Sequence, residues 1–308
     1  MKWPLSIITF LLVQFFTSGL VLAASYPVTI TDSDGKNITI SKPFTRIISL
    51  YPAHTTNLLE LGARNSLVAV SRSDKEMDRL PRVSFRDDPE RLLSLKPDLV
   101  LIRPMISRAY PHLVRRLEAS GVTVISLQPV SVDQLYDYWS TLGVICGRQE
   151  EARDLVARFR KGLERMAQKV AAIPINRRPR VYFEAIHRRM KTFAPTSMAI
   201  FVLENAGGVN VAADAIRLRN TNIAEYGKEK ILSKANEIDV FLAQKGRMNP
   251  VTIEDIVNEP GFQIIKAVRE GRIYLVDERV VSRPTPRLLE GMEIIYGLLF
   301  QGGKGGKR

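Results

Sequence analysis

The sequence predicts an α/β protein made of two similar lobes. The observation that carries this prediction is a pattern that occurs twice, at 90–102 and at 229–242. In each copy a glutamate opens a short amphipathic helix, and a polar turn leads into a continuous apolar run. Such a run is typical of a strand that is buried on both faces of a parallel sheet. Two copies so far apart indicate two lobes, each with one acidic residue, Glu90 or Glu229, at a helix start.

Residues 1–24 have the features of a signal peptide. Lys2 precedes an apolar stretch at 5–22, and small residues ending at Ala23 form a cleavage site of the usual kind. An uncleaved membrane anchor is the alternative, because the stretch is nearly long enough to span a bilayer. Cys146 is the only cysteine, so no lipid-attachment position follows the cleavage site. We therefore expect a soluble mature protein in the periplasm.

The N-terminal lobe is predicted at 25–147. It begins with a β-hairpin around Asp34-Gly35, because short stretches of alternating apolar and polar residues flank this turn dipeptide. Strands then alternate with helices, which implies parallel pairing with right-handed crossovers. The strands are expected at 46–50, 67–70, 98–102 and 122–127, and the helices at 55–61, 90–95, 111–119 and 132–145.

A connecting helix is predicted at 148–174. Its apolar residues recur at spacings of three and four, which is the stripe of one helix face. They are Ala152, Leu155, Val156, Phe159, Leu163, Met166 and Val170. The pattern allows one helix of about 25 residues, or ~37 Å. An ordinary amphipathic helix shows the same pattern, but the position between two α/β halves favours a stiff connector.

The C-terminal lobe is predicted at 175–301, as a second α/β series. Its strands are expected at 181–186, 238–243 and 272–276, and its helices at 196–206, 228–234, 252–257 and 286–300. Residues 302–308 form a flexible basic tail, because they contain no apolar residue that could pack.

Charge and motifs exclude several classes of function. The chain of 308 residues has a formal net charge of +13, but its basic residues are scattered. A nucleic-acid partner is therefore not expected, since it would require basic and aromatic residues interleaved on one element. Nucleotide-binding, nucleophile-elbow and zinc-protease motifs are absent from the sequence. We expect no enzyme, no catalytic residue, no cofactor and no dedicated metal site.

Ligands of open α/β folds bind beyond the carboxyl ends of the strands. The side chains expected at that edge are rich in arginine, which binds carboxylate and phosphate groups bidentately. An anionic ligand is therefore favoured, although each single arginine is as readily explained by a solvated surface. The candidate ligand-binding residues are Tyr51, His54, Arg103, Phe193, Arg247 and Arg283. Whether Tyr51 or His54 ligates a metal is left open.

The order of these segments resembles the periplasmic binding proteins for iron–siderophores, haem and vitamin B12. The resemblance covers essentially the whole mature chain, and it rests on 46–59, 80–83, 90–102, 149–173, 229–242 and 285–287. It implies two Rossmann-like lobes with mainly parallel sheets, joined by one long helix, with a shallow cleft and little hinge motion. It also implies a monomer that serves an ATP-driven importer of the inner membrane.

The resemblance assigns a role to the repeated pattern. In that family one glutamate per lobe docks onto arginines of the membrane permease, and Glu90 and Glu229 occupy the matching positions. Both are also explained as helix-start carboxylates that the helix dipole favours. Tryptophans of the B12-binding branch are not matched, since Ile223 and Val280 stand there.

The sequence therefore predicts a periplasmic solute-binding protein of an ABC importer, which captures an iron–siderophore or similar anionic metal chelate. A corrinoid or haem is the alternative ligand. A periplasmic enzyme that uses the same two-lobed fold is the alternative class.

Overall fold

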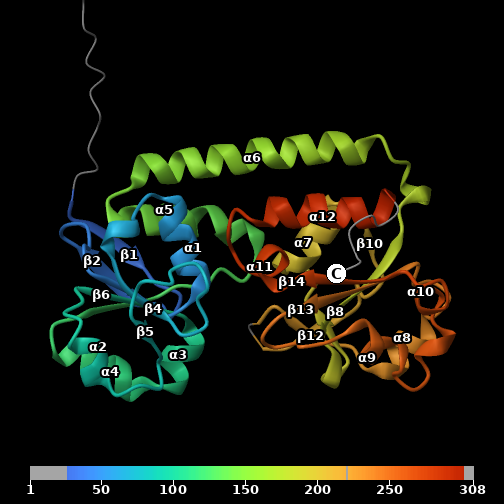
Figure 1. Ribbon diagram of the computed structural model, residues 1–308. Helices are drawn as coiled ribbons and strands as arrows, with labels where there is room; N and C mark the ends of the chain where they lie inside the picture. The colour runs from blue at the N-terminus through green and yellow to red at the C-terminus, as the bar shows by residue number, and fades with distance from the viewer. Residues whose placement is uncertain (1–25, 220, 302–308) are drawn as a thin grey trace, which may run out of the picture.

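The computed structural model describes residues 26–219 and 221–301. The predicted signal peptide and the basic tail lie outside these residues. The chain forms two α/β lobes, and one long helix, α6 (Gln149–Ala171), runs along both of them (Figure 1). Within the described part of the chain, no helix has the length and apolar character that crossing a membrane requires.

The N-terminal lobe contains the predicted hairpin and a five-stranded parallel sheet. The hairpin strands are β1 (Val28–Thr31) and β2 (Asn37–Ile40). The strand order of the sheet is β5-β4-β3-β6-β7, with bounds β3 (Ile47–Ser49), β4 (Leu67–Ser71), β5 (Arg82–Val83), β6 (Leu99–Ile102) and β7 (Thr123–Ser126). All four residues of β6 are buried, as the apolar run predicts for a central parallel strand.

Five helices cover this sheet. They are α1 (Pro52–Glu60), α2 (Pro89–Leu93), α3 (Pro104–Ala109), α4 (Pro111–Ala119) and α5 (Leu135–Cys146). Helix α1 begins three residues before the predicted start, because Pro52 is accepted in a first turn. Helix α2 begins after Asp88, whose side chain accepts a hydrogen bond from the Glu90 N–H. Helix α3 was not predicted, since only Ile106 of its six residues is buried.

The C-terminal lobe contains a seven-stranded mixed sheet. Strands β8 (Arg180–Ile186), β13 (Val240–Lys245) and β14 (Ile273–Asp277) pair in parallel, as predicted, and β10 (Val209–Asn210) pairs in parallel with β8. The antiparallel strands β9 (Lys191–Phe193), β12 (Ile223–Glu225) and β11 (Ile216–Arg217) extend the sheet beyond β8. They have two or three residues each, which is too short for an alternating pattern to be recognised.

The helices of the C-terminal lobe match the predicted segments, with two additional short ones. The bounds are α7 (Met198–Asn205), α8 (Lys228–Ser233), α9 (Ile253–Val257), α10 (Lys266–Arg269), α11 (Glu278–Val281) and α12 (Leu288–Phe300). Helices α10 and α11 have four residues each. Helix α9 begins with a capping box between Thr252 and Asp255.

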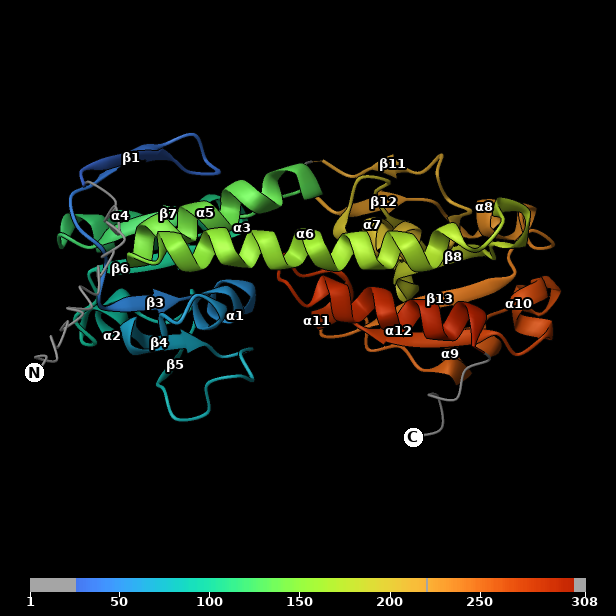
Figure 2. The ribbon, with the colours of Figure 1, turned by 90° about the horizontal axis from the view of Figure 1, so that it is seen from above.

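Helix α6 is the predicted connector, and it is one unbroken helix of 23 residues. Its buried stripe packs on α5 in one lobe and on α12 in the other (Figure 2). Phe159 meets Trp139 of α5 edge to face, with ring centroids 5.0 Å apart. Gly162 lies so close to α12 that an added Cβ would be 2.4 Å from Leu289 Cδ1. One hydrophobic core therefore continues from lobe to lobe beneath α6.

Candidate functional site

The candidate site lies where the strand order reverses in each sheet. In the N-terminal lobe this point falls between β3 and β6, and Tyr51 and Arg103 directly follow these strands. In the C-terminal lobe it falls between β8 and β13, which are followed by His187 and by the loop 246–252. The carboxyl edge at such a switch point is where open α/β sheets bind ligands.

Tyr51 and Arg103 form a stacked pair at the N-terminal edge. The guanidinium carbon of Arg103 lies 4.5 Å from the centroid of the Tyr51 ring, in cation–π geometry. Burial raises the pKa of Tyr51, while the charges of Arg103 and Arg283 act in the opposite direction. Tyr51 therefore carries its proton at neutral pH. Among the described residues Arg103 forms no ion pair with a carboxylate, so its charge is available to a ligand.

Arg283 is the arginine of the C-terminal lobe whose charge acts on Tyr51. Its Nη2 donates a hydrogen bond to Glu278 Oε1 at 2.6 Å, and both side chains are mostly buried. The other oxygen of Glu278 accepts a hydrogen bond from the backbone N–H of Arg247 at 3.1 Å. Gly246 is needed beside it, since an added Cβ would overlap the Glu278 carboxylate at 2.1 Å. The side chain of Arg247 is exposed.

His54 is not a cleft residue, which corrects the prediction from its position. Its side chain is 0% exposed and is bonded at both ring nitrogens. Nε2 lies 3.0 Å from the carbonyl oxygen of Ile102, which can only accept a proton, so Nδ1 accepts from the Tyr138 hydroxyl at 2.7 Å. Burial lowers the pKa of His54 to about 4, so the ring is neutral at neutral pH. No lone pair is left for a metal, and the ring instead supports Tyr51 edge to face.

Phe193 is also not placed for ligand contact. It lies in β9, is 1% exposed, and packs edge to face on Phe183 with centroids 4.9 Å apart. The prediction treated the segment after β8 as a loop at the sheet edge. The chain instead turns back at Met190 and forms an antiparallel strand, which buries Phe193 in the core.

Asn57 joins the two lobes, and the sequence did not single it out. Its Nδ2 donates to the carbonyl oxygen of Pro284 at 2.9 Å and lies 3.2 Å from the Tyr138 hydroxyl. Its Oδ1 accepts from Trp139 Nε1 at 3.1 Å. The partners are up to 227 residues away in the chain, so no local pattern could reveal them.

Glu90 and Glu229 are exposed, each in the first turn of its helix. Helices α2 and α8 lie on the side of their lobes that faces away from α6 (Figure 1). The Glu90 carboxylate is 56% exposed and pairs with Arg116 of α4. Glu229 has no ion-pair partner within the described ranges. Both carboxylates therefore lie on the surface opposite the connector.

Other hollows on the molecule are separate from this site. A groove of about 580 Å³ lies between α5 and α6 and contains none of the predicted ligand residues. A second lies beside the hairpin and α3. In the part of the chain that the structure describes, no three histidine, cysteine or carboxylate side chains gather as a metal site.

Comparison with known proteins places this geometry in a family. The family model described as "Periplasmic binding protein" matches residues 47–280, which span both sheets. The chain belongs to the periplasmic binding protein family. Its two α/β lobes and long helix α6 are therefore features of a periplasmic binding protein, and the predicted resemblance is confirmed.

Similar proteins cover most of this periplasmic binding protein. An uncharacterised ABC-transporter substrate-binding lipoprotein of Bacillus subtilis is 29% identical over 87% of this chain and 84% of its own length. A cobalamin-binding protein of Halobacterium salinarum is 26% identical over 88% and 73%. The solved structure of an ABC-type Fe3+-hydroxamate transport protein of Saccharomonospora viridis has a TM-score of 0.69 at 25% identity, over 89% and 99%.

Proposed function

We propose that this protein is the periplasmic substrate-binding protein of an ABC importer and that it captures an anionic metal chelate between its lobes. The observation that carries the proposal is the stacked pair of Tyr51 and Arg103 at the carboxyl edge of the N-terminal sheet, where Asn57 of α1 bonds to Pro284 beside Arg283 of the other lobe. An aromatic ring beside two guanidinium groups binds a flat or ring-bearing ligand that also carries negative charge. The family membership supports the same function.

An iron–siderophore is the ligand we favour. Arg103 and Arg247 offer guanidinium groups that form no ion pair among the described residues, whereas Arg283 is neutralised by Glu278. An excess of uncompensated positive charge favours a ligand with carboxylate, catecholate or hydroxamate oxygens. The likeness to the Fe3+-hydroxamate transport protein is consistent with this choice.

A corrinoid is the second candidate, because relatives named cobalamin-binding protein and vitamin B12-binding protein match over most of this chain. The two tryptophans expected of a B12 binder are absent here. Val280, which stands at one of these two positions, is 3% exposed and so offers a corrinoid no apolar surface in place of the tryptophan. Measured affinities for a ferric chelate and for a corrinoid therefore decide between the two ligands.

The binding test uses purified protein without added ligand. Mass spectrometry and absorbance spectra identify what co-purifies, and titrations with ferric hydroxamates, ferric citrate, haem, cyanocobalamin and free metal ions follow. We expect tight binding of a ferric chelate and none of free metal. Tighter binding of cyanocobalamin would move the proposal to the second candidate, and turnover of a chelate would establish an enzyme instead.

Arg103→Ala is expected to weaken binding of the ferric chelate by about 1–3 kcal/mol, which is roughly a 5- to 150-fold loss of affinity. The lost contact is a charge-assisted hydrogen bond from an uncompensated guanidinium. Arg283→Ala and Arg247→Ala are expected to have smaller effects, because Glu278 already pairs with Arg283 and Arg247 is exposed. Isothermal titration calorimetry measures the three affinities.

Arg86→Ala is the matched control, because Arg86 also stacks on an aromatic ring, that of Phe85, with its guanidinium carbon 5.7 Å from the centroid. Arg86 lies outside the proposed site, so the Arg86→Ala variant should bind the ferric chelate with the affinity of the wild type. Equal affinities for all four alanine variants would show that the ligand is neutral or binds elsewhere.

A further inference from the structure

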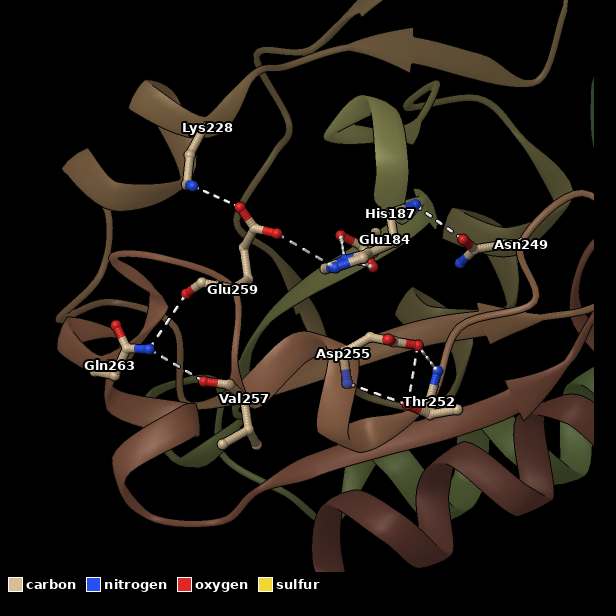
Figure 3. Close-up of polar contacts among 9 residues, drawn as sticks. All are labelled: Glu184, His187, Lys228, Asn249, Thr252, Asp255, Val257, Glu259 and Gln263. Carbon is tan, nitrogen blue, oxygen red and sulfur yellow. Dashed lines mark hydrogen bonds and ion pairs between the residues drawn. The ribbon is translucent and has the colours of Figure 1, made fainter.

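The loop that carries Arg247 is joined to helix α8 by a group of polar side chains, which we call the His187 cluster (Figure 3). Its members are Glu184, His187, Lys228, Asn249 and Glu259. They lie at the switch point of the C-terminal sheet. Glu184 is in β8, His187 begins the turn η4 (His187–Arg189), and Asn249 belongs to the loop after β13.

His187 lies between two carboxylates. Its Nδ1 is 3.0 Å from Glu184 Oε1, and its Nε2 is 3.7 Å from Glu259 Oε2. The other oxygen of Glu259 pairs with Lys228 at the start of α8. The Glu184 carboxylate is 0% exposed, so it needs a permanent partner. The imidazole therefore connects a buried carboxylate of the sheet with the ion pair that holds α8.

The backbone of His187 also holds loop 246–252, which carries Arg247. Its N–H donates to Asn249 Oδ1 at 2.9 Å, and Asn249 Nδ2 donates to the carbonyl oxygen of Gln244 at 2.8 Å. Asn249 is 2% exposed, so neither bond is exchanged for water. Arg247 is two residues before this anchor, and its direction depends on the anchor.

Several other charges face the imidazole from the elements around it. Asp255 on α9 and Lys228 on α8 lie on opposite sides, and Arg188 follows in η4. The hydrogen bond to Glu184 raises the pKa of His187, and burial raises the pKa of Glu184. Both shifts mean that the folded protein binds protons more tightly than the unfolded chain.

We propose that His187 is a positioning residue whose protonated ring, held between Glu184 and Glu259, fixes helix α8 against the sheet. The imidazolium donates a hydrogen bond from Nδ1 to Glu184 and carries a positive charge that attracts Glu259 at 3.7 Å, whereas the neutral ring keeps only the contact with Glu184. Loss of the proton leaves the buried Glu184 as the partner and releases Glu259 together with Lys228. The proposal rests on the proposed function in that α8 carries Glu229, which the permease of an ABC importer would meet.

The sign of the pH dependence follows from the raised pKa of His187. The stabilisation is complete below the ordinary histidine pKa of about 6.5 and is lost as the pH rises through the raised value. The raised pKa of Glu184 acts in the same direction, because it too favours the protonated folded state. Raising the pH from slightly acid to alkaline should therefore loosen α8, while loop 246–252 and the rest of the lobe stay folded.

Amide hydrogen exchange at a series of pH values tests this, with rates corrected for their intrinsic pH dependence. In the wild type, exchange at 228–233 should rise several-fold across the titration of His187, which NMR of the histidine ring follows, while 246–252 should show no step, because a backbone N–H holds Asn249. In His187→Gln segment 228–233 should exchange fast at every pH, without a step. In Glu259→Gln this segment should also lose its step, since the carboxylate that faces Nε2 is gone.

His112→Gln is the control, because His112 is an exposed histidine of the N-terminal lobe. It should retain the wild-type step. A wild type that shows no step while His187 titrates would overturn the proposal, as would a step that persists in His187→Gln. The readout needs no ligand. If neither a ferric hydroxamate nor cyanocobalamin binds, the proposed function fails while the step in exchange remains.

Discussion

Reversing both surface carboxylates, with Glu90→Lys and Glu229→Lys in one chain, is expected to abolish uptake of the ligand in cells. Each carboxylate is exposed in the first turn of a helix on the side away from α6, so a permease with cationic side chains would meet both at once. Opposed like charges at an interface cost several kcal/mol. The ligand affinity of the purified variant should be unchanged. Its free energy of unfolding should fall by no more than about 1 kcal/mol, because the pair of Glu90 with Arg116 is exposed.

A double variant on the opposite surface provides the control. Glu150 of α6 is 56% exposed and pairs with Arg153, as Glu90 is 56% exposed and pairs with Arg116. Glu293 of α12 is 54% exposed and pairs with Lys169. Glu150→Lys with Glu293→Lys changes the net charge equally and should leave uptake intact. Full uptake by the Glu90→Lys, Glu229→Lys variant would contradict a docking role and leave both residues as helix-start carboxylates only.

Asn57→Ala is expected to lower the free energy of unfolding by roughly 2–4 kcal/mol, the largest effect on stability that we predict. The substitution leaves Trp139 Nε1 and the carbonyl oxygen of Pro284 without their partner, and each unsatisfied buried group costs about 1–3 kcal/mol. It also removes the side-chain hydrogen bond that crosses from α1 to the C-terminal lobe. Denaturant unfolding followed by tryptophan fluorescence measures the change.

Asn37→Ala serves as the comparison, since Asn37 is an exposed asparagine whose Oδ1 accepts a bond from Thr31 in the hairpin. Its free energy of unfolding should stay within about 0.5 kcal/mol of the wild type. If Asn57→Ala were equally mild, water would have replaced the lost partners, and the two lobes would be held by the core beneath α6 and the ion pair of Glu76 with Arg287.

The sequence predicts the elements whose pattern is long and periodic. Helix α6 is found because its apolar stripe extends over many turns, and β6 because both of its faces are buried. Strands β9, β11 and β12 are missed because two or three residues carry no period. Strand β9 pairs with β8 through the turn at Met190 and with the more distant β12, and this pairing moves Phe193 from an expected edge into the core.

The sequence predicts which residues of the candidate site lie at the edge of a sheet. It does not predict which of their side chains point toward a ligand. Tyr51 and Arg103 come together because residues after neighbouring parallel strands share an edge, and Arg283 of the other lobe is near enough for its charge to act on Tyr51. His54 obeys the same rule, yet its side chain points inward to the Tyr138 hydroxyl. The direction of a side chain in a first helical turn depends on what packs beside it, here α5, which a pattern of residue types does not specify.

Within residues 26–219 and 221–301 each lobe is built from one continuous stretch of chain, and the segment with α6 is the covalent passage between them. The whole sheet of the N-terminal lobe is complete in sequence before β8 begins, so this lobe can fold ahead of the remainder as the chain emerges during synthesis. The hydrogen bond between Trp139 and Asn57 lies within the N-terminal lobe, so it can form before the bond from Asn57 to Pro284. Assembly would therefore end at the seam where we propose that the ligand binds, so a newly made chain gains this site last.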